Sequence, residues 1–180
     1  MAALVMIRAE VWKELGGYES NYFAFHEDAD MSWRCWQKGL RVQYVPDAIG
    51  RHRYEFSRVD NKMYLVERNR LIFMFTCWDS RTLMLLSPVI AATELAMLLI
   101  GWRSGWLAEK VHGWGWLLSH RRWLRQRRRE VQSNRTVSDR ELAPLLSERL
   151  DAKNFPIPHF LRGLDAAAAS YWRFVRRFLR

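Results

Sequence analysis

The chain has 180 residues, which is enough for one ordinary domain with an appendage and too few for two full domains. Hydrophobic residues make up 49% of the chain, which excludes wholesale disorder. The two cysteines lack the CxxC spacing of a zinc site and are too few for a disulfide scaffold, so we expect a reducing compartment. The net charge of +10 lies in the second half, because residues 1–80 hold 11 basic and 11 acidic side chains. This division predicts two regions with different tasks.

The first elements of the chain alternate between strand and helix patterns. The apolar run over 3–8 predicts a short strand, and 9–15 predicts a short helix that ends at Gly16 and Gly17. An aromatic loop follows, and the three acids within 27–30 begin a helix of about three turns.

The next elements continue this alternation. The helix that begins with the acids ends at Gly39, because glycine tolerates the left-handed conformation that often follows a helix. Polar and apolar residues alternate over 41–46 and predict a second strand, and 60–78 predicts a helix with Asp60 as its N-cap. We therefore expect an α/β fold in the first half.

The second half begins with an apolar stretch. Residues 83–102 hold Glu94 as their one charge, and 20 residues are enough to cross a bilayer. Pro88 and Glu94 both argue against a regular span, so a shallow or re-entrant insertion and a full crossing stay open.

Basic and aromatic residues dominate the rest of the chain. Six arginines lie within 121–129, after an apolar helical stripe at Leu107, Val111, Trp114 and Leu118. A second amphipathic helix is predicted over 170–180. No DNA- or RNA-binding pattern accompanies the arginines, so nucleic acid is not an expected partner. Arginines beside tryptophans instead predict helices that lie on an anionic membrane surface, with the arginine run on the cytoplasmic side.

The acids at the start of the third element have a structural explanation. Carboxylates in the first turn offset the partial positive charge of a helix N-terminus. Asp28 can serve as the N-cap, and Asp30 can pair with Arg34 four residues later. Spacing alone therefore accounts for all three acids without any chemistry.

The surroundings of these acids carry a second explanation. Gly16-Gly17-Tyr18 precedes an aromatic segment, and Glu27-Asp28-x-Asp30, Trp33-Arg34, Gly39, "VP" with Ala48 and then His52 follow in order. This series resembles the acceptor-side half of inverting family 2 glycosyltransferases of the GT-A fold. The resemblance is strong over 1–75 and looser over 80–150.

The resemblance implies a fold and a division of the chain. The fold would be a partial, Rossmann-like GT-A domain of the α/β class that lacks its nucleotide-binding half, followed by a mainly helical C-terminal region. Residues 1–80 would be the acceptor-side part, 81–130 the membrane-associated helices, and 131–180 a basic helical tail.

The resemblance also implies roles for single residues. Asp28 would be the general base that takes a proton from the acceptor hydroxyl, and Glu27 would orient it or contact the acceptor. Arg34 and Gly17 would lie on the substrate side, although Arg34 can equally brace the helix through Asp30. Trp33 could stack on a sugar ring or be buried packing.

The expected cofactor is a divalent metal, Mg²⁺ or Mn²⁺, that stabilises the diphosphate leaving group. His52 would approach this metal, although a lone histidine is also an ordinary polar residue. Asn69, in the middle of an apolar helix, would anchor the loop that carries His52.

The expected function is transfer of a sugar, with inversion, from a nucleotide-sugar donor to a cell-envelope or lipid-linked glycan at the cytoplasmic face of the membrane. Family members bind the donor with an N-terminal half that we expect this chain to lack, so the chain alone should not bind a nucleotide sugar. The alternative is a non-catalytic scaffold or partner-binding module on the membrane surface.

Overall fold

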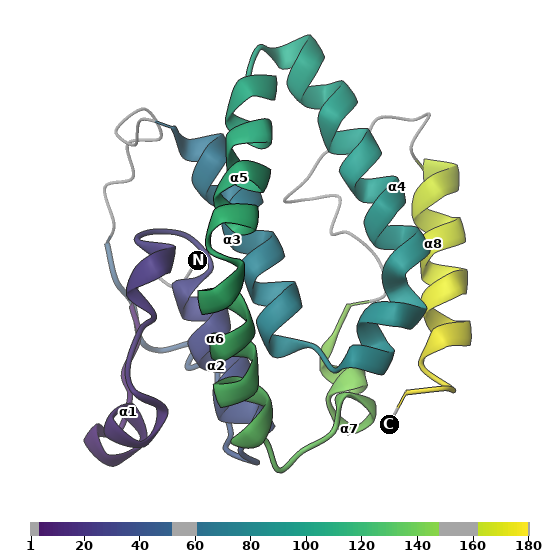
Figure 1. The fold of residues 1–180 in the computed structure, drawn as a ribbon. Coiled ribbons are helices and arrows are strands. Elements are labelled where there is room, and N and C mark those ends of the chain that lie inside the picture. The colour runs from purple at the N-terminus through teal and green to yellow at the C-terminus, as the bar shows by residue number, and fades with distance from the viewer. Residues whose placement is uncertain (1–3, 52–60, 148–161, 180) are drawn as a thin grey trace.

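The computed structural model of the protein describes residues 4–51, 61–147 and 162–179 (Figure 1). Among these residues the regular elements are all helical. In chain order they are α1 (Ala9–Leu15), the 3-10 turn η1 (Ser20–Tyr22), α2 (Glu27–Gln37), α3 (Lys62–Cys77), α4 (Ser80–Ser104), α5 (Leu107–Ser119), α6 (Arg121–Ser133), α7 (Asp139–Leu142), the 3-10 turn η2 (Ala143–Leu145) and α8 (Arg162–Val175).

The expected α/β, Rossmann-like fold is therefore wrong for the described part of the chain, which has no β-strand. The two predicted strands are found as segments without regular structure, at 5–8 and 40–45. A strand is stable only when its backbone groups pair with a neighbouring strand. All of residues 41–50 are exposed, so no partner covers the apolar half of the alternating pattern.

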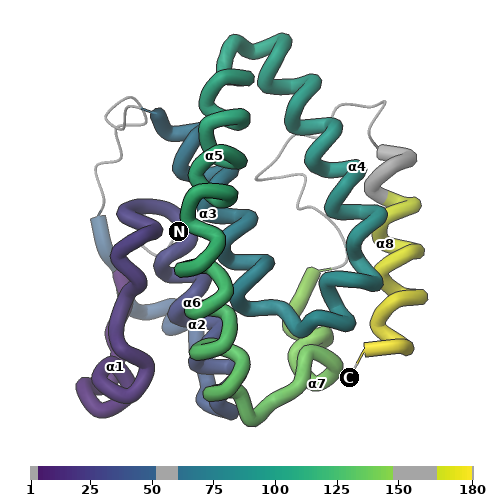
Figure 2. The backbone as a smooth tube through the Cα atoms, in the orientation of Figure 1, coloured from purple at the N-terminus to yellow at the C-terminus, as the bar shows by residue number. Residues whose placement is uncertain are grey.

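Helix α3 lies at the centre of the fold and packs against α2, α5 and α6 (Figures 1 and 2). Its Leu71 and Ile72 join Tyr22 and Leu117 in a buried cluster. The sequence predicted this helix over 60–78, and it is observed over Lys62–Cys77. The N-cap is Asn61 rather than Asp60, and Asp60 lies outside the described residues.

Helices α4 and α5 form a hairpin (Figure 1). Its turn is closed by the Trp106 N–H, which donates to the Gly101 carbonyl at 2.9 Å. Among the described residues α4 is the one helix that is long and apolar enough to cross a membrane. α8 lies beside α4, and the Tyr171 hydroxyl donates to the Leu85 carbonyl at 2.6 Å.

The arginine run at 121–129 is divided by the packing of α6. Arg121, Arg122, Arg125 and Arg129 are exposed. Arg127 turns inward and donates from Nη2 to Asp30 Oδ2 at 3.2 Å. Arg128 holds the carbonyls of Phe75 and Trp78 at the end of α3. Two of the six arginines therefore stabilise the fold and four face solvent.

Candidate functional site

The site is built on the chain turn that leads into α2. Phe25 and His26 have φ angles of 68° and 69°, which reverse the chain just before Glu27. Such angles are unfavourable for residues other than glycine, so the surrounding structure has to hold them.

The side chain of Asn69 holds this turn. It is fully buried on α3, and its amide Nδ2 lies 2.9, 2.7 and 2.8 Å from the carbonyls of Tyr22, Ala24 and Phe25. The sequence predicted that Asn69 anchors the loop carrying His52, whereas the observed contacts anchor the loop in front of α2. A buried amide is stable only when it is hydrogen-bonded, which explains an asparagine in this apolar helix.

The neighbouring Arg68 supports the same loop. Its Nη2 donates to the Asn21 carbonyl at 2.6 Å, and its Nε and Nη2 donate to Asn69 Oδ1 at 3.0 and 2.8 Å. Arg68 and Asn69 therefore act as one unit that positions the start of α2 relative to α3.

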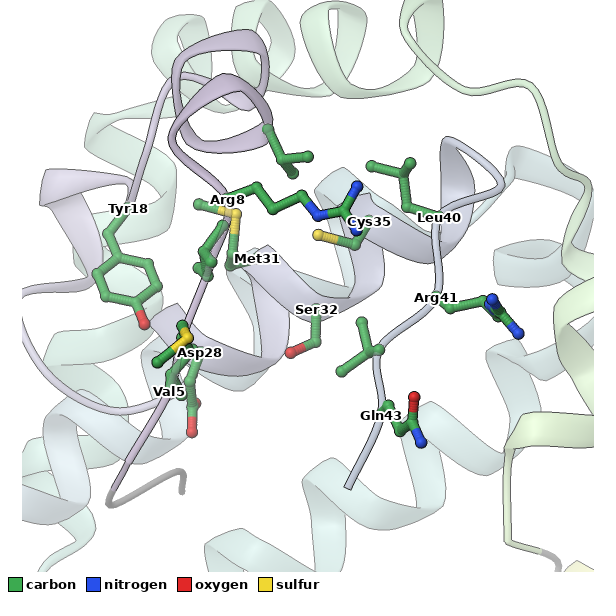
Figure 3. A pocket seen from close by; sticks show the side chains of 14 residues that line it. Val5, Arg8, Tyr18, Asp28, Met31, Ser32, Cys35, Leu40, Arg41 and Gln43 are labelled. Carbon is green, nitrogen blue, oxygen red and sulfur yellow. The ribbon is translucent and has the colours of Figure 1, made fainter. Parts of the chain in front are cut away.

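A cavity of about 450 Å³ opens beside α2 (Figure 3). One face of α2 forms its floor, and the segments at 5–8 and 40–43 form its two sides. The floor residues follow one another at three- or four-residue spacing, which places them on one side of a helix. They are Asp28, Met31, Ser32 and Cys35.

Asp28 is the carboxylate of this cavity. It is the second residue of α2, and the N-cap is His26, so the predicted N-cap role of Asp28 is wrong. Its Oδ1 accepts a hydrogen bond from the Ala29 N–H at 2.8 Å. A carboxylate in the first turn is stabilised by the partial positive charge of the unpaired N–H groups, and Asp28 also lines the cavity.

Glu27 lies next to Asp28 and is half-buried. Its Oε2 is buried without a hydrogen-bond partner. Burial, with a further contribution from the charge of Asp28, raises the pKa of Glu27 above its usual range, although a backbone hydrogen bond opposes this. Glu27 and Asp28 are therefore two neighbouring carboxyl groups in different environments, an arrangement that is common at acid–base sites.

The predicted pair of Asp30 and Arg34 is confirmed. Arg34 Nε donates to Asp30 Oδ2 at 2.7 Å, and both side chains are buried. The other two nitrogens of the guanidinium donate to the carbonyls of Leu15 and Gly17 at 2.5 and 2.8 Å. Arg34 and Gly17 are thus in contact with each other, and neither lines the cavity.

Trp33 lies on the opposite side of α2 from the cavity. It is 4% exposed and packs edge-on against Trp36 and Phe73, with ring centroids 5.9 Å apart in both pairs. In this position the indole contributes to the core between α2 and α3.

Several cavity residues were missed by sequence reasoning. Tyr18 and Ser32 place hydroxyl groups beside Asp28, and Arg8 extends over the cavity toward Cys35 (Figure 3). Burial, followed by the charges of Asp28 and Glu27, raises the pKa of Tyr18. The three- and four-residue spacing from Asp28 could have identified Ser32, but Arg8 comes from a segment that only the folded chain brings near.

The expected metal has no ligand set in the described residues, which contain no group of three or more His, Cys, Asp and Glu side chains. His52, the predicted metal ligand, lies outside those residues. Mg²⁺ is often held by only one or two carboxylates together with water and substrate phosphates, so the metal stays a prediction.

No protein-family model, curated protein or solved structure that we compared with this chain matches it.

Proposed function

We propose that the cavity beside α2 is the acceptor side of an inverting glycosyl-transfer site, with Asp28 as the general base. The observation that carries this proposal is the position of Asp28, a first-turn carboxylate on the floor of a 450 Å³ cavity. The order of motifs from Gly16 to His52, which resembles family 2 glycosyltransferases, supports the same role.

The proposed step is a direct displacement. An acceptor hydroxyl oxygen attacks the anomeric carbon, and the bond from that carbon to the nucleoside diphosphate breaks. The diphosphate leaves with the bonding electrons, and the hydroxyl proton passes to Asp28. The step requires a bound nucleotide-sugar donor, which the test below supplies with a donor-binding half in trans or by fusion.

The other residues would position Asp28. Glu27 would orient it or contact the acceptor, and the hydroxyls of Tyr18 and Ser32 could hydrogen-bond to the acceptor. Arg34 and Gly17 would act through the chain turn that they hold together.

The test is Asp28→Asn in the full chain, combined with a donor-binding half in trans or by fusion. We expect transfer to fall by about 10²–10⁴-fold, with the helical circular dichroism unchanged. Asp47→Asn is the matched control, because Asp47 is an exposed acid that does not line the cavity. Equal activity of Asp28→Asn and the wild type would contradict the proposal.

A second candidate function is a non-catalytic scaffold on the membrane surface. Helix α4 favours membrane association for both candidate functions, because only 6% of its most apolar 18 residues is buried in the fold.

We place the protein at the cytoplasmic face, peripheral or shallowly inserted, near a lipid-linked acceptor. Flotation with anionic liposomes tests the location, and binding that requires DNA or RNA but ignores lipid would contradict it.

A further inference from the structure

The structure leaves one long apolar surface uncovered, on the outward side of α4. Its members follow one another at three- or four-residue spacing, so they form a single stripe about 27 Å long. They are Met84, Pro88, Ala91, Leu95, Leu99 and Trp102, and all six are exposed. We call this surface the α4 stripe.

The charges on α4 are arranged around this stripe. Arg81 and Arg103 lie at the two ends of the helix, and Glu94 is the one charged residue between them. Glu94 points to the other side of the helix, where its Oε2 lies 2.8 Å from Lys110 Nζ and 2.8 Å from Trp114 Nε1. Its Oε1 pairs with Arg70 of α3.

The inward side of α4 contacts protein at several points. The ion pairs of Glu94 join it to α3 and α5, and Tyr171 joins it to α8. If α4 were surrounded by lipid as a spanning helix, these ion pairs would separate inside the hydrocarbon, which is costly for every charge involved. The outward side of the helix is therefore available to lipid, while these contacts hold its other side against protein.

A detail at Pro88 fits a lipid-facing stripe. Proline has no N–H, so the Met84 carbonyl loses its helical partner at this position. The Ser87 hydroxyl donates to that carbonyl at 2.8 Å and replaces the missing hydrogen bond. An unpaired carbonyl would oppose contact with hydrocarbon, and here it is paired.

We infer that α4 lies in the plane of an anionic membrane interface, with the α4 stripe in the acyl boundary and its two terminal arginines at the headgroups. Long arginine side chains can reach the headgroups from the edge of such a helix. In-plane helices of this kind insert by about 5–10 Å. This inference rests on the membrane association proposed above and is independent of the transfer chemistry.

Depth measurements along the stripe test this inference. Spin labels are placed one at a time by Met84→Cys, Leu95→Cys and Leu99→Cys in the full chain, where Cys77 is fully buried and Cys35 is replaced by Ala. Tyr44→Cys, which is 84% exposed and outside the stripe, is the control. Collision with oxygen and with a water-soluble nickel complex reports each depth in phosphatidylglycerol–phosphatidylcholine vesicles.

We expect the three stripe labels to lie at one shallow depth and the control label to stay in water. A Leu95 label near the bilayer centre, with a Met84 label near the surface, would show that α4 crosses the membrane and would overturn the inference. Stripe labels that remain in water with vesicles present would also overturn it. None of these outcomes depends on Asp28.

A partition experiment gives a second measure. Leu95→Glu with Leu99→Glu should weaken binding to the same vesicles by about tenfold or more, since two carboxylates would enter the acyl boundary. Ile49→Glu, at a loop residue that is 87% exposed, should leave binding unchanged. Equal binding of the double variant and the wild type would contradict a contact through the α4 stripe.

Discussion

Arg34 donates to Asp30 across one turn of α2, and the same guanidinium donates to the Gly17 carbonyl. The buried pair of Arg34 and Asp30 therefore connects the glycine turn to the helix that carries the acids. Arg127 of α6 also reaches Asp30, at 3.2 Å. The acids of α2 therefore have separate tasks, because Asp30 is enclosed by two arginines while Asp28 lies on the cavity floor.

We expect Asp30→Asn to lower the free energy of unfolding by about 3–5 kcal/mol, because it leaves the buried Arg34 without its counter-charge. Arg127 would keep Glu19, whose Oε2 lies 3.7 Å from Arg127 Nε. Urea unfolding followed by circular dichroism measures the change. Asp47→Asn, at an exposed acid, should change stability by less than about 0.5 kcal/mol. A loss no larger than that of the control would show that the pair contributes little.

Gly17→Ala should destabilise the fold by about 1–2 kcal/mol or more. Its φ of +69° is unfavourable for alanine, and an added Cβ would lie 2.8 Å from Trp12 Cζ2. Gly115→Ala is the control with the opposite sign, since Gly115 lies in α5 with open space around it, and alanine should stabilise that helix by about 0.5–1 kcal/mol. The melting temperatures of the two variants measure these effects. A shift in the same direction for Gly17→Ala and Gly115→Ala would contradict the conformational explanation.

The ionised form of Glu27 should oppose folding. Because burial raises its pKa in the folded state, the folded protein binds the proton more tightly than the unfolded chain. The unfavourable contribution is absent below the ordinary pKa and complete above the raised one, so stability should fall as the pH rises through this window. Glu27→Gln should remove this dependence, so its stability relative to the wild type should increase as the pH rises through this window.

Unfolding curves at several pH values measure this effect. Glu10→Gln is the control, because Glu10 also lies in the first turn of a helix but is exposed. If Glu27→Gln gained no more stability with rising pH than Glu10→Gln, the burial of Glu27 would have no energetic effect.

Glu67 should behave in the opposite way. Burial raises its pKa, but hydrogen bonds and charges from Arg70 and Lys110 outweigh burial and lower the pKa below its usual range. The Lys110 Nζ lies 2.6 Å from Glu67 Oε2, and both side chains are buried. The stability that ionised Glu67 contributes is present above its ordinary pKa and is lost as the pH falls through the lowered one.

Glu67→Gln should therefore cost about 3 kcal/mol at pH 7, and the cost should shrink as the pH falls through the lowered pKa, because wild-type Glu67 then becomes protonated. Chemical denaturation at each pH measures the difference in free energy of unfolding. A difference that stays constant as the pH falls from 7 through the acid-unfolding range would refute the role of the ionised form. Glu10→Gln again serves as the exposed control.

The sequence by itself determined the features that depend on near neighbours in the chain. The helices at Ala9–Leu15, Glu27–Gln37 and Lys62–Cys77 and the pairing of Asp30 with Arg34 follow from local spacing of three or four residues. The apolar character of α4 follows from its composition. The C-terminal helix, predicted over 170–180, is instead observed over Arg162–Val175. The placement of Asp28 in the first turn of α2 is local in the same sense.

Only the tertiary structure decided what depends on distant segments. The two predicted strands did not form in the described residues, because strand stability requires a partner that local pattern cannot supply. Asn69 holds residues more than forty positions earlier, and Arg127 reaches Asp30 while Arg125 faces solvent. Whether a side chain is buried or paired depends on which surfaces of the folded chain come into contact. For Asn69 and Arg127, the packing of α3 and α6 near α2 determines their partners.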